Sequence, residues 1–486
     1  MTTGTARASR TAWWGLAVLA FPTLLSAVDM NVLFLALPRL TAELGASAAE
    51  QLWITDGYGF LVAGFVLTMG TLGDRIGRRR LLFAGAAVFA ATSVVAAYSV
   101  SAEMLIAARA LLGVAGATLM PSTLALIAVM FADGGPRRLA ISIWATCQFA
   151  GAALGPVVGG VLLEHFWWGS VFLLALPVMA VVLVAGPFVL PEHVGDEPGR
   201  LDPGSVALSL AAVLAVIYGI KAAATATAPP AVAAVAVVAG VVAGVLFVRR
   251  QLRLAQPLLD LRLFRTPRVA IVLAALVGAG IAMAGSGFQV TQYLQTVLGY
   301  APVAAALLFA PMGLGVAAGT LLTPVLVRRV PERVAISGGL ALAAGGSLLL
   351  AFVPGDAGPA PAVVAVTVLA LGTGPLFALG TGYVIGAVPV ARAGAAAALA
   401  DTGNYLGGAL GLALLGTAAA ATYRLHMSGV PGPAGETVSG AVAAPGAGPA
   451  VVDAAHAAFT AGLHAVGLTS AVVFAALAVA TSRLRP

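Results

Sequence analysis

The sequence predicts an all-α membrane protein with fourteen transmembrane helices, and three observations support this fold class. First, 60% of the 486 residues are hydrophobic and only 9% are charged, which leaves too little polar surface for a soluble domain. Second, fourteen apolar runs of bilayer-spanning length follow one another along the chain. Third, the basic residues gather in alternate loops, as the topology of a multi-pass protein requires.

The apolar runs are each long enough to cross a hydrocarbon core of about 30 Å as a helix. The first run continues past Asp29, so it is too long for a signal peptide and is expected to be retained as a helix. The predicted helices are residues 13–38, 52–72, 81–100, 104–131, 139–162, 170–190, 204–224, 230–248, 269–296, 303–324, 334–353, 362–388, 395–420 and 461–481.

The distribution of charge sets the predicted orientation. Of the 25 Lys and Arg residues, 21 lie in the loops of one side and three in the loops of the other, which favours cytoplasmic termini. The net charge of +7 therefore indicates membrane topology and not nucleic-acid binding. Cys147 is the single cysteine, and no Walker loop or HExxH motif occurs. We expect no metal site, no cofactor, no ATP-driven transport and no enzymatic activity in this chain.

The stretch from Gly70 to Leu82, GTLGDRIGRRRLL, joins two of the apolar runs. Its arginines alone would indicate a cytoplasmic topology anchor. The pattern G-x-L-x-D-R-x-G-R-[RK]-x-x-L is more specific, and it resembles the signature loop of the major facilitator superfamily. The resemblance implies a loop that holds the cytoplasmic gate shut, with Asp74 and Arg75 carrying that contact. The matched residues are Gly70, Asp74, Arg75, Gly77, Arg78 and Arg79.

The same resemblance implies the domain organisation of the major facilitator fold. Residues 1–190 form one six-helix half, and residues 269–486 form the other, with an external loop at about 421–460. Residues 191–268 form two inserted helices with their linkers. Because it is rich in Gly, Ala and Pro, the 421–460 loop is either a flexible linker or a structured external hairpin.

Four charged residues fall inside or at the ends of predicted helices: Asp29, Asp56, Arg109 and Asp401. A charge at the bilayer centre costs about 2.5–3.5 kcal/mol on insertion scales, so such residues indicate function. Burial disfavours the charged form of a carboxylate, which makes a buried aspartate a natural proton carrier or partner for a cation. The alternatives are a static pair of Asp29 with Arg109, and hydrated positions for Asp56 and Asp401 near the helix ends.

The surroundings of two of these charges sharpen the resemblance. The stretch DMNVLFLALP, which begins at Asp29, is similar to the helix-1 motif of 14-helix drug:proton antiporters. It departs from that motif at Asn31 and Phe34, which leaves the substrate range open. Arg109, with Gly113 and Gly116, resembles the family's helix-4 motif, which implies a role in coupling proton movement to Asp29.

A run of small residues, GAALGPVVGG, follows in the predicted fifth helix. Its spacing allows close helix approach, and its proline can bend the helix, so packing alone is a sufficient explanation. The run also matches G-x-x-x-G-P-x-x-G-G, which in this superfamily marks exporters. The matched residues are Gly151, Gly155, Pro156, Gly159 and Gly160.

Further residues could line a substrate pocket, since pockets combine apolar walls with a few polar groups. Packing is an equal alternative for them. They are Asn31, Phe34, Trp144, Phe288, Gln289, Gln292, Tyr293, Asn404 and Tyr405.

The resemblance as a whole implies a proton-coupled antiporter that exports lipophilic or cationic drugs across the bacterial inner (cytoplasmic) membrane. Its expected partners are drug-like small molecules, protons and the lipid bilayer, without nucleic acid, and the expected state is a monomer. The alternative is a dedicated exporter of one antibiotic or siderophore. A remote alternative is a non-transporting membrane sensor.

Overall fold

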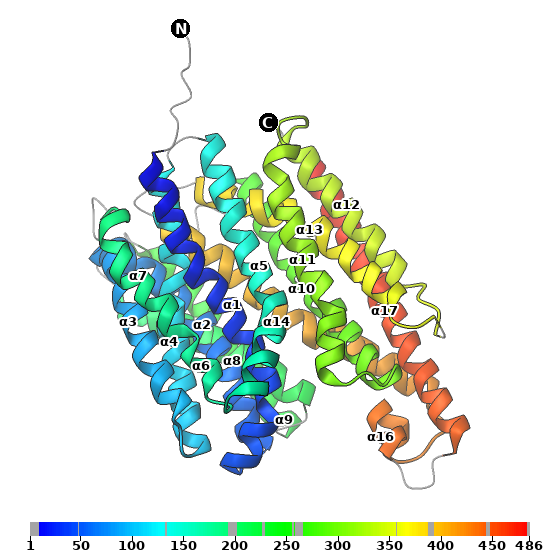
Figure 1. Ribbon diagram of the computed structural model, residues 1–486. Coiled ribbons are helices and arrows are strands. Elements are labelled where there is room, and N and C mark those ends of the chain that lie inside the picture. Colours follow the sequence, from blue (N-terminus) through cyan, green and yellow to red (C-terminus); the bar gives the residue numbers. More distant parts are fainter. Residues whose placement is uncertain are drawn as a thin grey trace. The chain divides into compact units, whose positions relative to one another are not determined.

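The computed structural model describes residues 9–46, 48–131, 134–192, 202–225, 229–254, 257, 266–355, 357–386, 393–443 and 448–483, and every regular element in these ranges is a helix (Figure 1). The elements are α1 (Arg10–Leu44), α2 (Ala48–Ile76), α3 (Arg78–Ala97), α4 (Ala102–Met130), α5 (Gly134–His165), α6 (Ser170–Leu173), α7 (Ala175–Val189), α8 (Pro203–Thr225), α9 (Pro230–Arg253), α10 (Pro267–Gln292), the π-helix η2 (Tyr293–Val297), α11 (Pro302–Leu326), α12 (Glu332–Leu350), α13 (Ala360–Gly386), α14 (Ala393–His426), α15 (Pro433–Glu436), α16 (Val438–Ala443) and α17 (Pro449–Ser482).

The predicted all-helical membrane fold is confirmed. Within the described residues, twelve helical segments are long and apolar enough to cross a membrane. The long helices α5 and α8 lie at two further predicted ranges, so each of the fourteen predicted ranges overlaps a helix. The range 170–190 is covered by α6 and α7 together, because the helix is interrupted at Leu174.

Local chemistry explains where several helices begin and end. Ser101 caps α4, since its hydroxyl accepts a hydrogen bond from the backbone N–H of Met104 at 3.2 Å. Gly77 separates α2 from α3 with a φ of 105°, a conformation that L side chains rarely adopt. The signature loop is therefore a single tight break between two helices.

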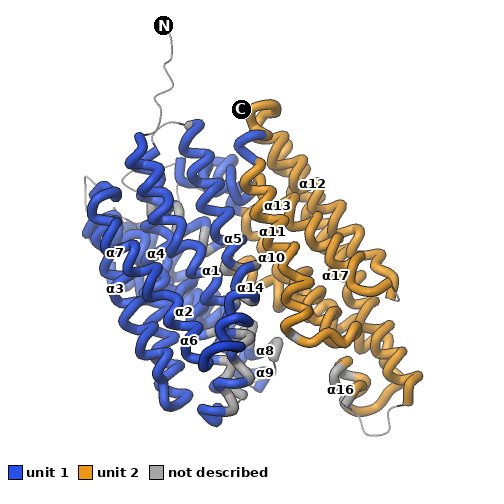
Figure 2. Tube along the Cα trace, viewed as in Figure 1, with its two compact units in different colours: residues 1–273, 323–325, 377–403 blue, residues 274–322, 326–376, 404–486 orange. Residues whose placement is uncertain are grey.

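The chain divides into two compact units (Figure 2). Unit 1 comprises residues 1–273, 323–325 and 377–403, and unit 2 comprises residues 274–322, 326–376 and 404–486. The helices α10, α11, α13 and α14 each contribute residues to both units. The predicted division into two repeated halves with an insertion at 191–268 stays a prediction.

Within unit 1, neighbouring helices pack in pairs: α1 on α5, α2 on α4, α3 on α4, and α8 on α9. Glycines permit the closest approaches. A Cβ atom added at Gly151 of α5 would clash with the carbonyl oxygen of Leu24 in α1. One added at Gly113 of α4 would lie 2.6 Å from the carbonyl oxygen of Tyr58 in α2. These contacts bring α1, α2, α4 and α5 around one buried region.

Within unit 2, α12 packs on α17, and the predicted loop at 421–460 is largely helical where it is described. α17 begins at Pro449, twelve residues before the predicted start at 461. The Tyr423 hydroxyl donates to the carbonyl oxygen of Ala434 at 2.8 Å. A buried apolar cluster joins the end of α14, α15, α16 and the start of α17, and its members are Tyr423, Met427, Ala434, Val438, Ala441, Ala455 and Ala458. Of the two alternatives for this segment, the described residues favour the packed hairpin.

Candidate functional site

The centre of the candidate site is an ion pair buried inside unit 1. Nη1 of Arg109 in α4 lies 2.8 Å from Oδ2 of Asp29 in α1, and the side chains are 1% and 6% exposed. The sequence predicted both residues as candidates and offered their pairing as one alternative, and the structure brings them together. Both partners are buried, so each charge depends on the other.

A third helix completes the surroundings of Arg109. Its Nε donates to the carbonyl oxygen of Ile54 in α2 at 3.0 Å. Its guanidinium carbon lies 4.7 Å from the ring centroid of Tyr58, a cation–π contact with a side chain that is itself buried. Tyr58 packs edge-on against Phe89 of α3, with ring centroids 6.4 Å apart. The arginine is therefore held in place even where its carboxylate partner is neutral.

The signature loop forms a second charged cluster in unit 1. Asp74 pairs with Arg78, one helical turn further along the chain, whose side chain is buried. Arg79 donates to the carbonyl oxygen of Leu190 at 3.1 Å and to the Glu192 carboxylate at 3.3 Å. Arg80 lies 3.7 Å from the same carboxylate.

The structure shows which neighbouring arginine pairs with Asp74. The partner is Arg78, and the gating role that the resemblance implies for Asp74 and Arg75 stays a prediction. The Nε atom of Arg75 is buried and has no hydrogen-bond partner among the described residues. Sequence analysis missed Glu192, which lies more than 110 residues further along the chain. The signal in the sequence that could have indicated Glu192 is an acidic residue directly after an apolar run, which is a suitable partner for the arginine-rich loop.

The exporter motif on α5 separates into two parts. Gly151 is in tight contact with α1, near Leu24 and Ala27. Gly155 and Gly159 are buried, whereas a Cβ atom at Gly160 would meet no atom within 4 Å. Close packing against α1 explains why position 151 is a glycine, whereas no steric contact requires a glycine at position 160.

The predicted pocket residues that the structure describes divide between the two units. In unit 2, Gln289 and Tyr293 are buried, Phe288 is 43% exposed, and Gln292 and Asn404 are half-buried. Tyr293 begins the π-helix η2, a rare element that is frequent at functional sites. In unit 1, Trp144 is buried and donates to Thr123. The side chains of Asn31, Phe34, Asp56, Pro156, Asp401 and Tyr405 lie outside the described part of the structure.

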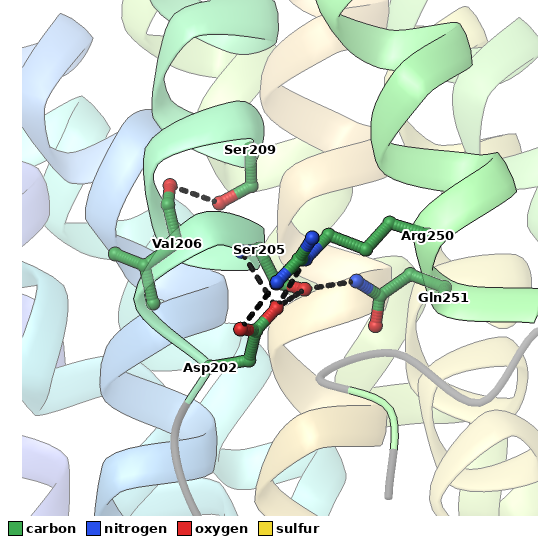
Figure 3. A network of polar contacts seen from close by, with 6 residues as sticks. All are labelled: Asp202, Ser205, Val206, Ser209, Arg250 and Gln251. Atoms are coloured by element: carbon green, nitrogen blue, oxygen red, sulfur yellow. Dashed lines mark hydrogen bonds and ion pairs between the residues drawn. The ribbon is translucent and has the colours of Figure 1, made fainter. Parts of the chain in front are cut away.

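A further polar network joins α8 and α9 (Figure 3). Nε and Nη2 of Arg250, near the end of α9, lie 2.5 Å and 2.8 Å from the two carboxylate oxygens of Asp202, directly before α8. Asp202 also accepts hydrogen bonds from the backbone N–H and the hydroxyl of Ser205. Gln251 donates to that hydroxyl at 2.6 Å. The hydrogen bonds from Arg250 and then Ser205 hold the pKa of Asp202 well below the usual carboxyl range.

Together, these features define a polytopic helical membrane protein with a buried ion pair among its helices and a charged loop between α2 and α3, the arrangement of a secondary transporter. Residues 19–412 match the Major Facilitator Superfamily. The chain belongs to this superfamily.

Several characterised relatives align over most of the chain. The multidrug efflux pump LfrA of Mycolicibacterium smegmatis is 42% identical, over 98% of this chain and 97% of the relative. The methyl viologen resistance protein SmvA of Salmonella typhimurium is 34% identical, over 94% of this chain and 95% of the relative. The tetracenomycin C resistance and export protein of Streptomyces glaucescens is 29% identical, over 83% of this chain and 75% of the relative.

The fold also resembles a solved structure, that of the human organic anion transporter MFSD10 (TETRAN). The TM-score is 0.65 with 15% sequence identity, covering 97% of this chain and 99% of the other. At this level of identity the likeness extends to the fold alone.

Proposed function

We propose that the protein is a proton-coupled antiporter that exports drug-like molecules, mainly lipophilic or cationic ones, across the bacterial cytoplasmic membrane. The observation that carries the proposal is the buried pair of Asp29 and Arg109 at the meeting point of α1, α2 and α4. The named activities of the relatives, multidrug efflux and methyl viologen resistance, agree with it. Methyl viologen is an organic dication, a substrate for which a titratable carboxylate is a suitable partner.

The geometry of the Asp29–Arg109 pair suggests how proton uptake is coupled to the export of a cation. While Asp29 is ionised, it is paired with Arg109 at 2.8 Å. A proton taken up from outside neutralises Asp29 and weakens both this pair and any cation held by the carboxylate. Arg109 keeps its contacts with Ile54 and Tyr58, so it stays in place while Asp29 is released. The membrane potential supplies about 2.3 kcal/mol per charge per 100 mV, in addition to the pH gradient.

The remaining elements of the proposal follow from the topology. Both termini lie in the cytoplasm, and the signature loop acts at the cytoplasmic gate through Asp74 and its partner Arg78. The protein works as a monomer and catalyses no covalent reaction. Asp56 and Asp401 are the further acids proposed to carry protons or substrate.

Proton flux in proteoliposomes tests the proposal. Protein is reconstituted under an imposed pH gradient, and proton movement is followed on addition of ethidium or methyl viologen. We expect cation-triggered proton flux in the wild type and its loss in Asp29→Asn, because asparagine neither titrates nor carries a charge. Glu103→Gln is the matched control, since Glu103 is an exposed acid in the first turn of α4.

Flux that persists in Asp29→Asn would remove Asp29 from the coupling. A folded wild-type protein that moves no proton with any cation would overturn the polyspecific antiporter.

A dedicated exporter of one antibiotic is the second candidate. It is favoured by relatives that are named for single compounds, the tetracenomycin C exporter and a cephamycin export protein of Amycolatopsis lactamdurans that is 33% identical over 85% of this chain. Coupled flux with one compound and none with a panel of unrelated cations would support this candidate.

A further inference from the structure

Between α4 and α5, unit 1 contains a polar cluster that the coupling mechanism does not use. The indole N–H of Trp144 in α5 donates to the Thr123 hydroxyl in α4 at 3.0 Å. That hydroxyl donates in turn to the carbonyl oxygen of Met120 at 2.9 Å. Trp144 is 5% exposed, and Thr123 is fully buried. The side-chain hydrogen-bonding groups of Trp144 and Thr123 therefore all have partners within the cluster.

Gln148 lies one turn further along α5. Of the two polar groups of its amide, only the NH2 group has a hydrogen-bond acceptor. Its amide nitrogen lies 3.9 Å from the Met120 sulfur, which is a weak acceptor. Its carbonyl oxygen is buried and has no hydrogen-bond partner among the described residues. Turning the amide over would not help, because the sulfur has no proton to donate to the carbonyl oxygen. Such an atom costs free energy unless a donor reaches it.

The surroundings of this oxygen suit a flat lipophilic molecule. Trp144 precedes Gln148 by one turn, and Met120 lies opposite it on α4. One aromatic side chain and an adaptable methionine near one polar group are common components of a ligand site. Gln148 as a whole is half-buried, but its carbonyl oxygen is enclosed, so a ligand reaches this oxygen only when a flexible neighbour such as Met120 moves aside.

We propose that Gln148 determines specificity, because its carbonyl oxygen accepts a hydrogen bond from an N–H group of an aromatic cationic substrate. The inference rests on the proposed export of drug-like cations and adds the chemical class that this part of the site prefers. Cations with amino groups gain one hydrogen bond at Gln148. Cations without an N–H gain nothing there and depend on the apolar contacts and on charge.

Two lipophilic monocations separate these contributions. Ethidium carries aromatic amino groups, and tetraphenylphosphonium carries no N–H. Binding of each cation to purified protein in detergent is measured for the wild type, Gln148→Leu, Gln148→Glu and Cys147→Ala. We expect Gln148→Leu to raise the Kd for ethidium about three- to tenfold, the range of one hydrogen bond. The Kd for tetraphenylphosphonium should change less than about twofold, because this cation has no N–H group and loses no hydrogen bond.

The other variants serve as controls. Gln148→Glu keeps a carbonyl oxygen at the same length and should retain the preference for ethidium. Cys147→Ala changes the neighbouring side chain and should shift neither Kd. Equal shifts for the two cations in Gln148→Leu, or no shift for either, would overturn the inference, because a purely structural glutamine affects both alike. Binding is read without transport, so selective binding in a protein that moves no proton would keep this inference and reject antiport.

Discussion

At the scale of single residues, the most constrained side chain is Arg109. It is 1% exposed and is held by the Asp29 carboxylate, the Ile54 carbonyl oxygen and the Tyr58 ring. A buried ion pair contributes little net stability compared with apolar residues of similar volume, but removing one partner leaves an uncompensated charge. The pair is therefore a poor choice for stability alone, which agrees with the role in proton coupling that we propose for it.

A double-mutant cycle tests this explanation. Arg109→Met leaves Asp29 buried without its partner and should destabilise the protein by about 3–5 kcal/mol. Asp29→Asn combined with Arg109→Met removes both charges and should recover most of that loss. Thermal unfolding in detergent measures stability, and coupled flux in proteoliposomes measures function. We expect the double variant to be folded and inactive.

Two results would contradict this account. If the double variant were as unstable as Arg109→Met, the pair would be needed for folding. If it exported cations with proton coupling, the coupling would lie elsewhere, at Asp56 or Asp401.

At the scale of elements, the exporter motif on α5 offers a contrast between two glycines of one helix. Gly151→Ala places a methyl group against the Leu24 carbonyl oxygen in α1 and should destabilise the protein by about 1–3 kcal/mol, as overpacking does. Gly160→Ala meets open space and should be neutral or stabilising by up to about 1 kcal/mol, since alanine favours a helix. Melting temperatures of the two variants give the comparison.

The activities of the same variants distinguish packing from a directional role. If Gly160→Ala melts like the wild type but exports poorly, the motif has a role beyond packing. If only Gly151→Ala loses export, and in proportion to its stability, packing of α5 on α1 is a sufficient explanation.

The elements also show where reading the sequence fails. α17 begins at Pro449, although composition suggested a loop up to residue 460. The segment from 449 to 460 is rich in alanine and contains Asp453 and His456, so its hydropathy is low. Alanine is nevertheless the strongest helix former, and Ala455 and Ala458 are buried against the start of the hairpin. Hydropathy detects the most apolar part of a helix and misses a less apolar extension of the same helix.

At the scale of the whole molecule, the predicted orientation can be tested directly. A predicted span count of fourteen and the arrangement of basic loops predict that both termini lie in the cytoplasm. A fluorescent protein that matures only in the cytoplasm should therefore be bright when fused after Pro486 or after Arg253, and dark when fused after Gly429. A dark C-terminal fusion of an inserted, folded protein would require an odd number of spans.

The sequence predicted the features that leave a strong local signal, namely the helices and the buried charges. Long apolar runs gave the helices, and the rarity of intramembrane charge identified Asp29 and Arg109. Contacts between distant uncharged or weakly marked residues gave no such signal. Tyr58 under Arg109 and Gln148 beside Met120 are ordinary residues of apolar helices until the packing places them together. Partner choice within the signature loop likewise depends on three-dimensional geometry.

The ion pair between Asp202 and Arg250 has a consequence if the protein is the proton-coupled antiporter that we propose. In such a protein, some carboxylates change protonation state during transport, whereas others must stay ionised to hold the structure. The depressed pKa of Asp202 keeps it charged, so its contribution to stability is complete above the ordinary carboxyl range near pH 4 and fades only as the medium becomes more acidic than that. The ion pair between the start of α8 and the end of α9 is therefore expected to persist below pH 4. The contact between α8 and α9 is thus insensitive to the moderate changes in acidity that the proposed antiport at Asp29 would involve.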